Sequence, residues 1–189
     1  LYQSEMQRTV TNMLTNHGFE NGTVSPWSAE SSSSSNIANI NTNTKYTGNS
    51  SLAIVSAASS GEVIYSCTAA QSAVGNTYTF SGYVKTSFSG AASNGGVMLA
   101  LSYKDTDGNT EYVNSKAITS TCEWKRLSAT VTLPDDYLSG SLKLILKIKN
   151  SQCTAFFDDL QFEIGSTANR CNLLENGYFS ESVVSTSAS

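Results

Sequence analysis

The stretch Ser141–Lys149 reads Ser-Leu-Lys-Leu-Ile-Leu-Lys-Ile-Lys. Aliphatic side chains fall on alternate positions, at Leu142, Leu144, Leu146 and Ile148, and lysines occupy most of the positions between them. Successive side chains of a β-strand point to opposite faces of its sheet, so one face of this stretch is apolar and the other is charged. The pattern predicts a strand that packs one face on a hydrophobic core and leaves the other in water.

The same two-residue period returns along most of the chain after Ser51. It is clearest in Tyr78–Val84, Leu99–Tyr103 and Leu127–Leu133. Turn residues separate the runs, at Gly75-Asn76, Asp107-Gly108 and Pro134-Asp135-Asp136. About eight short strands at this spacing predict an all-β sandwich or barrel. The Ser- and Asn-rich segment from Ser31 to Thr44 predicts a long surface loop with at most a short edge strand.

Composition narrows the class of protein. The chain has 189 residues, which is enough for about one sandwich domain. Only 14% of its residues are charged, as is typical of extracellular β proteins. Its net charge of -4 provides no basic face for phosphates, so we expect neither nucleic acid nor anionic membrane as a partner. No apolar run approaches the roughly 20 residues that span a bilayer, and residues 1–10 do not resemble a signal peptide, so we expect a piece of a larger protein.

The cysteines do not indicate a metal site. Cys67, Cys122, Cys153 and Cys171 form no C-x-x-C pair, and His17 is the single histidine. This combination gives little support to a zinc site. The four cysteines allow a disulfide, but their spacing does not choose among the three pairings.

A short repeat marks both ends of the predicted domain. Residues 12–19 read Asn-Met-Leu-Thr-Asn-His-Gly-Phe and residues 172–179 read Asn-Leu-Leu-Glu-Asn-Gly-Tyr-Phe, so both follow the pattern Asn-apolar-Leu-x-Asn-x-x-Phe. An offset of 160 residues is the length of a whole domain. The repeat therefore predicts a linker at 1–11, a β-sandwich module at 12–171, and the start of a following repeat or a linker at 172–189.

Several stretches of the chain resemble the galactose-binding-like jelly-roll carbohydrate-binding modules of families 4, 9 and 22. The stretches are Asn16–Glu20 with Trp27, Tyr46–Leu52, Tyr78–Lys85, and Trp124–Leu127 followed by Phe156–Glu163. The ending, from Asp158 through Gly165 to Gly177, is most similar to tandem modules of bacterial wall-associated proteins with YD (RHS) repeats. The resemblance implies a two-sheet antiparallel jelly-roll sandwich in a secreted or cell-surface bacterial protein, with one sheet concave. It also implies binding of polysaccharide or cell-surface glycan, beside neighbouring modules of the same chain.

Catalytic chemistry is not indicated. An enzyme of this kind needs a nucleophile with a base, or two carboxylates held across a cleft. His17 lies in the opening motif and is interpreted as a turn residue. Asp158 and Asp159 are neighbours in a predicted strand, so their side chains point to opposite faces and cannot act together on one bond. We therefore expect a non-catalytic module.

One carboxylate is predicted to be buried. Asp158 shares its parity with Phe156, Leu160 and Phe162, which places it on the apolar face. A buried anion needs a partner. Two alternatives remain open: a structural calcium ion held with Glu20 and backbone carbonyls, or capping by backbone N–H groups without a metal. The family resemblance favours calcium, because Glu20 and Asp158 match the positions that supply its side-chain ligands.

Exposed tyrosines are the predicted sugar contacts. An aromatic ring stacks on the apolar C–H face of a pyranose, and polar side chains bind its hydroxyls. Tyr83 and Lys85 leave the sheet opposite the core residues of their strand, so Tyr83 is a predicted platform and Lys85 a hydroxyl donor. Tyr112 and Tyr103 are predicted contacts in the same groove, because the run that holds Tyr112 pairs through the Asp107-Gly108 turn with the strand that holds Tyr103.

The tryptophans favour the core over a sugar platform. Trp124 opens a strong strand and is predicted to be buried, and Trp27 fits either environment. Family 22 modules often carry a tryptophan beyond the Ser-Leu strand, whereas this chain has Ala57–Gly61 there. A glycan-binding module is therefore the first functional hypothesis, and a structural spacer or adhesion repeat without a sugar site is the alternative.

Overall fold

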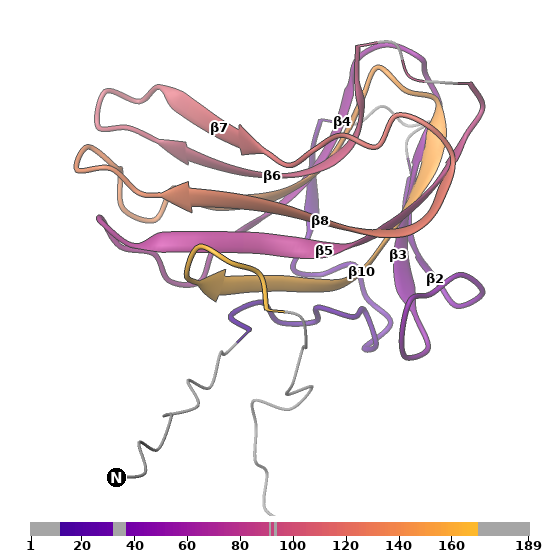
Figure 1. The fold of residues 1–189 in the computed structure, drawn as a ribbon, viewed down its shortest axis with the longest axis horizontal. Coiled ribbons are helices and arrows are strands. Elements are labelled where there is room, and N and C mark those ends of the chain that lie inside the picture. The colour runs from indigo at the N-terminus through magenta and orange to yellow at the C-terminus, as the bar shows by residue number, and fades with distance from the viewer. Residues whose placement is uncertain (1–11, 32–36, 91, 93, 170–189) are drawn as a thin grey trace, which may run out of the picture.

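A computed structural model describes residues 12–31, 37–90, 92 and 94–169. These residues form ten strands in two antiparallel sheets of five, which pack face to face (Figure 1). The described residues contain no helix, and therefore none that is long and apolar enough to cross a membrane. The prediction of an all-β, two-sheet jelly-roll sandwich is confirmed.

Sheet A has the strand order β1-β4-β9-β6-β7. Its strands are β1 (Ser28–Ser31), β4 (Glu62–Thr68), β9 (Lys143–Lys149), β6 (Gly96–Lys104) and β7 (Thr110–Asn114). The central strand β9 is the alternating stretch predicted at 141–149. Its aliphatic side chains Leu144, Leu146 and Ile148 are each 1% exposed, and they pack in the core between the sheets.

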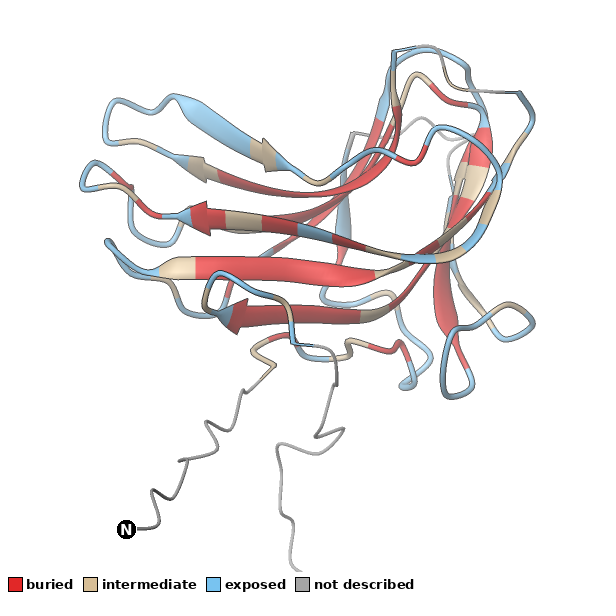
Figure 2. Cartoon of the chain, in the orientation of Figure 1, coloured by how far each residue is buried: buried red, intermediate tan, exposed pale blue. Residues whose placement is uncertain are grey.

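Sheet B has the strand order β2-β3-β10-β5-β8. Its strands are β2 (Ile37–Asn41), β3 (Ser51–Ser56), β10 (Cys153–Ile164), β5 (Thr77–Phe88) and β8 (Cys122–Thr132). The predicted core residues Phe80 and Val84 of β5 are fully buried. Figure 2 shows the buried residues along the strands of both sheets, and exposed residues in the connecting loops.

The described residues have two more strands than the eight or so that the sequence indicated. The segment Ser31–Thr44, predicted to be a surface loop with at most a short edge strand, contains the edge strand β2, and β1 ends at its first residue; the two strands belong to different sheets. The Asp107-Gly108 turn is confirmed as a hairpin between β6 and β7. Gly108 has φ +88°, a conformation that glycine adopts without steric strain.

A bulge interrupts the alternation of β10. The register of β10 against β5 shifts between Asp158 and Gln161, and Asp159 has φ +45°. Phe157 is fully buried in the core, whereas Phe156 is half-buried on the other face of the sheet. The prediction that Phe156 faces the core is wrong, because the inserted residue reverses the parity of the strand at this point.

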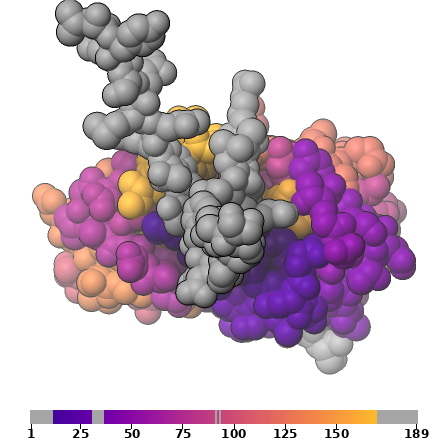
Figure 3. All heavy atoms as spheres, turned by 90° about the horizontal axis from the view of Figure 1, so that it is seen from below, coloured from indigo at the N-terminus to yellow at the C-terminus, as the bar shows by residue number. Residues whose placement is uncertain are grey.

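The opening segment of the module fastens this bulged strand. The side-chain oxygen of Asn12 accepts the N–H of Phe162 at 3.0 Å, and its amide donates to the carbonyl of Leu160 at 3.0 Å. The N–H of Met13 adds a bond to the carbonyl of Phe162 at 2.8 Å. The first described residues therefore lie beside the last strand, as Figure 3 shows on the underside of the molecule. The matching segment at 172–179 lies outside the described residues, as do residues 1–11.

Replacing Asn12 tests this clamp. Asn12→Ala removes both side-chain bonds to β10, so we expect the free energy of unfolding to fall by about 1–3 kcal/mol, the usual cost of leaving backbone polar groups without partners. Urea denaturation followed by circular dichroism measures the change. Asn43→Ala, at an exposed loop position, is the control and should change stability by less than about 0.5 kcal/mol. Equal effects of the two substitutions would contradict the clamp.

Candidate functional site

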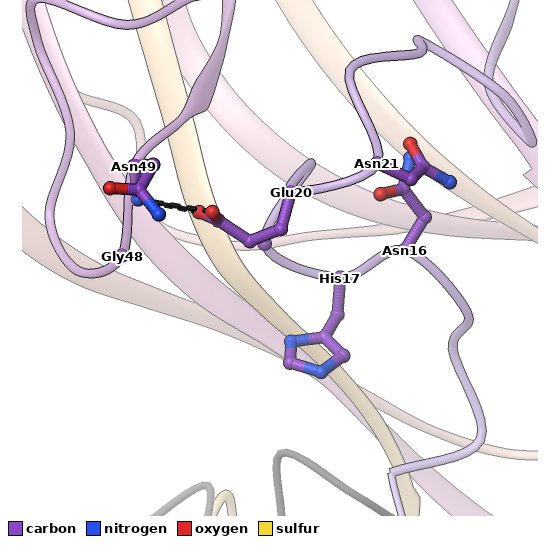
Figure 4. Close-up of a pocket in the computed structure, with 7 residues that line it drawn as sticks. Asn16, His17, Glu20, Asn21, Gly48 and Asn49 are labelled. Atoms are coloured by element: carbon purple, nitrogen blue, oxygen red, sulfur yellow. Dashed lines mark hydrogen bonds between the residues drawn. The ribbon is translucent and has the colours of Figure 1, made fainter.

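A polar pocket of about 490 Å³ lies where the opening motif meets the loop between β2 and β3 (residues 42–50). Its lining residues are Asn16, His17, Gly18, Glu20, Asn21, Gly48 and Asn49. In Figure 4 the side chain of Glu20 reaches toward Asn49, whereas the His17 ring points away from it. His17 lies in a turn, as predicted.

The Glu20 carboxylate caps the β2–β3 loop. Its Oε1 accepts the backbone N–H groups of Asn49 at 2.9 Å and Ser50 at 3.0 Å. Gly48 has φ +63°, and a Cβ atom there would lie 2.4 Å from Oε1 of Glu20. Only glycine therefore permits this approach of the loop to the carboxylate.

The Asp158 carboxylate holds the other side of the same loop. Its Oδ2 accepts the N–H groups of Tyr46 at 2.8 Å and Thr47 at 3.1 Å, and its Oδ1 accepts the N–H of Asp159 at 2.7 Å. Asp158 is fully buried, as predicted, but beneath the loop on the outer side of sheet B and not in the core between the sheets. Burial raises the pKa of Asp158 to about 6, the three N–H groups oppose this rise, and the charge of Asp159 adds to it.

Glu20 and Asp158 meet only part of the requirements of a calcium site. Backbone N–H groups cap the carboxylates of Asp158 and Glu20, as the metal-free alternative predicted. Among the described residues, no group of three or more Asp, Glu, His or Cys side chains is placed to hold a metal. Nevertheless, Glu20 and Asp158, which are far apart in sequence, both accept N–H groups of the β2–β3 loop. A Cβ at Gly18 would lie 3.6 Å from Cγ of Glu20 and 3.8 Å from Oδ1 of Asp158. Carboxylate oxygens are ligands that Ca²⁺ prefers, so Glu20 and Asp158 are the side chains that could hold such an ion.

An aromatic cluster covers part of the outer face of sheet B. The Tyr46 and Tyr83 rings stack with centroids 3.7 Å apart, and the Trp124 ring lies 5.8 Å from that of Tyr46. The Arg126 guanidinium lies 5.7 Å from the centroid of the Tyr83 ring. Tyr83 and Lys85 point outward from β5, as predicted. Sequence analysis did not identify Tyr46, because its contact with Tyr83 depends on how the β2–β3 loop folds back over the sheet.

Trp124 is not a core residue. It is half-buried on the outer face and shares the parity of Arg126, whereas Leu127 of the same strand faces the core. The prediction of a buried Trp124 is wrong, although the alternation of β8 carried the signal that assigns it to the outer face. Trp27 is 4% exposed and packs in the core with its ring 6.0 Å from that of Phe80.

Tyr112 lies on the opposite side of the molecule from Tyr83. Its strand β7 pairs with β6 in sheet A, where Tyr112 is opposite Ser102 and is 52% exposed. Tyr83 belongs to sheet B. The outer faces of two packed sheets point in opposite directions, so the expectation that these tyrosines line one groove is wrong. Alternation assigns a residue to a face of its strand, but it does not assign the strand to a sheet.

Tyr103 lies on neither outer face. It shares its parity with Leu99 and Leu101, packs at the edge of the core, and makes an edge-on contact with Tyr137 at 6.0 Å between centroids. Its hydroxyl pKa is raised, by burial first and by the nearby carboxylates of Glu111, Asp136 and Asp105. Tyr103 is therefore a packing residue and does not belong with the predicted sugar contacts.

The outer face of sheet A has an apolar centre. Ile64, Ala100 and Ile145 form a cluster separate from the main core, with exposed fractions of 9%, 0% and 1%. They point away from the core, because they alternate with core residues along their strands. At the border of this face, the Lys147 ammonium lies 5.3 Å from the centroid of the Tyr112 ring.

Ion pairs surround this apolar centre. Lys143 bonds Glu30 across β9 and β1, and Lys147 lies 3.6 Å from the Glu62 carboxylate. Burial tends to raise the pKa of Glu30, but hydrogen bonds from Lys143 and Ser66 outweigh it and hold the pKa below its usual value. The face therefore combines an apolar centre, an exposed ring and charged hydrogen-bonding groups.

The described cysteines are free. Cys67, Cys122 and Cys153 form no disulfide with one another, and Cys171 lies outside the described residues. Burial raises the pKa of both Cys67 and Cys153 to about 12. These two thiols therefore stay protonated at neutral pH and are poor nucleophiles.

Comparison with known families agrees with this architecture. A family model described as a carbohydrate binding domain matches residues 11–152, most of the chain, and the protein belongs to this family. Among curated proteins, none matches the chain.

Solved structures share the fold at low sequence identity. The CBM22-1 xylan-binding domain from Paenibacillus barcinonensis is 22% identical with a TM-score of 0.61, and the match covers 80% of this chain and 94% of that domain. A family 22 module of Clostridium thermocellum is 21% identical with a TM-score of 0.60, covering 84% and 99%. TmCBM61, solved with β-1,4-galactotriose, is 20% identical with a TM-score of 0.55, covering 82% and 99%.

Adjacent aspartates allow a matched test of the buried cap. Asp158→Ala leaves three backbone N–H groups without their acceptor, so we expect it to lower the free energy of unfolding by about 2–4 kcal/mol. Asp159→Ala removes a carboxylate that accepts a bond from the Thr47 hydroxyl at 2.8 Å and should cost less than about 1.5 kcal/mol. Urea unfolding in a chelating buffer measures both. A larger loss from Asp159→Ala would show that the Asp158 cap is not the dominant contact.

Proposed function

We propose that this chain is a non-catalytic carbohydrate-binding module of a larger extracellular protein, and that it binds polysaccharide on the outer face of sheet A. Membership of the carbohydrate binding domain family supports the ligand class. The observation that carries the choice of face is the Tyr112 ring, which is 52% exposed and lies on this face beside the charged groups of Lys147 and Lys143. A sugar presents apolar C–H faces together with hydroxyls, and this face offers surfaces for both.

The rings on sheet B are less suited to a sugar platform. Tyr46 covers one face of the Tyr83 ring at a centroid distance of 3.7 Å. The Lys85 ammonium, predicted to donate to a hydroxyl, is 2.8 Å from the Glu123 carboxylate. A ring that already stacks within the protein has lost the surface on which a pyranose would lie. Tyr112 has no such neighbouring ring among the described residues and remains 52% exposed.

The carboxylates on the sheet A face favour binding over hydrolysis. A glycosidase acid needs a raised pKa, so that it is protonated when the glycosidic bond breaks. Glu30 has a lowered pKa because of its bonds to Lys143 and Ser66, and Glu62 is paired with Lys147. These groups are suited to hydrogen bonding with sugar hydroxyls, and they support the non-catalytic part of the proposal.

The larger protein is proposed from the sequence. The segment 172–179 repeats the opening motif, which supports neighbouring modules in the same chain. The similarity of the ending to bacterial wall-associated proteins with YD (RHS) repeats supports a secreted or cell-surface location in a bacterium. Similar solved structures include a xylan-binding domain and a module in complex with β-1,4-galactotriose, so xylan and β-1,4-linked galactans are suitable first ligands to test.

Tyr112→Ala is the first test of the binding face. We expect affinity for a bound glycan to fall at least about tenfold, equivalent to ~1.4 kcal/mol, because the exposed platform is lost. Calorimetric titration with soluble xylan, xylohexaose and β-1,4-galactotriose measures this. Tyr46→Ala, on the opposite face and of similar exposure, is the matched control and should leave affinity unchanged. A loss with Tyr46→Ala alone would place the ligand on sheet B. A lack of binding across a broad glycan array would favour the spacer or adhesion repeat.

We also propose a structural calcium ion bound by Glu20 and Asp158. The supporting observation is the meeting of these carboxylates on one loop, with Asp158 buried next to Asp159. A bound calcium ion would supply positive charge that neutralises the two carboxylates. Glu20 and Asp158 would hold the ion by their side-chain oxygens, while Gly48 keeps the loop close to them.

Melting in calcium and in chelator tests this proposal. At 100 times its dissociation constant a ligand of the native state adds about 2.7 kcal/mol, so we expect the melting temperature to rise by roughly 5–10 °C in calcium. Glu20→Gln preserves the size of the side chain and one acceptor oxygen but removes the charge, and it should abolish most of the response. Superimposable melting curves of the unmodified protein in calcium and in chelator would falsify the calcium site.

A further inference from the structure

The chain leaves the sandwich across the outer face of sheet B. Asn169 donates its backbone N–H to Oε1 of Glu163 at 3.0 Å and its side-chain amide to Oε2 at 2.7 Å. The carbonyl of Asn169 accepts a bond from the Arg126 guanidinium. Glu163 is 2% exposed, although it follows the core residue Phe162 and therefore points outward. These bonds fix the direction in which the chain leaves the module.

The aromatic cluster begins at this exit. The Arg126 guanidinium that holds Asn169 also bonds Oε1 of Gln161 at 2.5 Å and lies over the Tyr83 ring. Tyr83 continues the cluster to Tyr46, which is 42% exposed, and from there to Trp124. A partly exposed apolar surface therefore extends from the point where the described chain ends.

The presence of a following module rests on the proposal above that residues 172–179 begin one. Asn12 already occupies the Leu160 carbonyl and the Phe162 N–H, so a second motif that clamps in the same way would need the last strand of another module. Two residues lie between Asn169 and Asn172, so three Cα–Cα steps place these two residues at most about 11 Å apart. A following module would therefore begin within reach of the outer face of sheet B.

We propose that the outer face of sheet B, centred on Tyr46, Tyr83 and Trp124, is the docking surface for the following module of the same chain. The short connection holds the two modules at high effective concentration, so even a small apolar contact is sufficient for docking. Burying the partly exposed rings removes apolar area from water, which stabilises the contact. The outer face of sheet A, where the sugar is proposed to bind, remains open in this arrangement.

A tandem protein tests the docking directly. Residues 1–171 are followed by a second copy of residues 12–169, which preserves the native connection, and the 189-residue chain is the single-module reference. Trp124→Ala in the first copy should lower the melting temperature more in the tandem than in the reference. It should also change the small-angle X-ray scattering from that of one compact particle to that of two loosely linked ones. Trp124→Phe should restore both properties.

The same tandem contains a matched control. Trp124→Ala in the second copy removes the same side chain from a module that has no successor, so its effect should equal that in the single chain. Tyr46→Ala in the first copy is the alternative variant if Trp124→Ala prevents folding. Equal melting losses for the two copies, with unchanged scattering, would overturn the docking proposal. Reduced glycan affinity of the single chain with Trp124→Ala would also overturn it, because the face would then be a sugar surface.

Discussion

The buried carboxylate of Asp158 joins the central strand of sheet B to the β2–β3 loop, and the arrangement of the outer surface depends on this contact. Three backbone N–H groups compensate the cost of removing the charge from water. By holding the N–H of Tyr46, Asp158 also fixes the start of the side chain that stacks on Tyr83. Glu20 accepts N–H groups at the far end of the same loop. Two carboxylates therefore determine the position of a segment that forms no β-strand.

Strand alternation predicted the core wherever the ladder is regular. The aliphatic face of β9 and the pair Phe80 and Val84 of β5 lie in the core as their sequence period required. The same reasoning failed in β10, because one inserted residue exchanges the two faces and brings Phe157 into the core in place of Phe156. A bulge has no clear sequence pattern. The hydrogen bonds that Asn12 makes beside this bulge join residues that are far apart in the sequence.

The candidate site was less predictable than the core, because it depends on contacts between segments that are distant in sequence. Tyr83 was correctly placed on an outer face, but its partner Tyr46 comes from a loop that folds over the sheet. Tyr112 was expected beside Tyr83, and it lies on the opposite side because a hairpin can join either sheet without changing its own pattern. Trp124 differs from these cases, since the parity of β8 already assigned it to the outer face.

The positions where the chain enters and leaves explain why the two outer faces differ in chemistry. Asn12 is bonded to Phe162, and Asn169 is bonded to Glu163, so entry and exit meet at adjacent residues of β10. Adjacent ends place the connections of the proposed neighbouring modules on one side of the sandwich, away from the outer face of sheet A. Sheet B carries β10 and so has the rings and the exit contacts at Arg126, whereas sheet A has a separate apolar centre and the exposed Tyr112. The bulged strand β10, with its entry and exit contacts, thus lies in sheet B, which carries the proposed docking surface, and the proposed sugar surface lies on the other sheet.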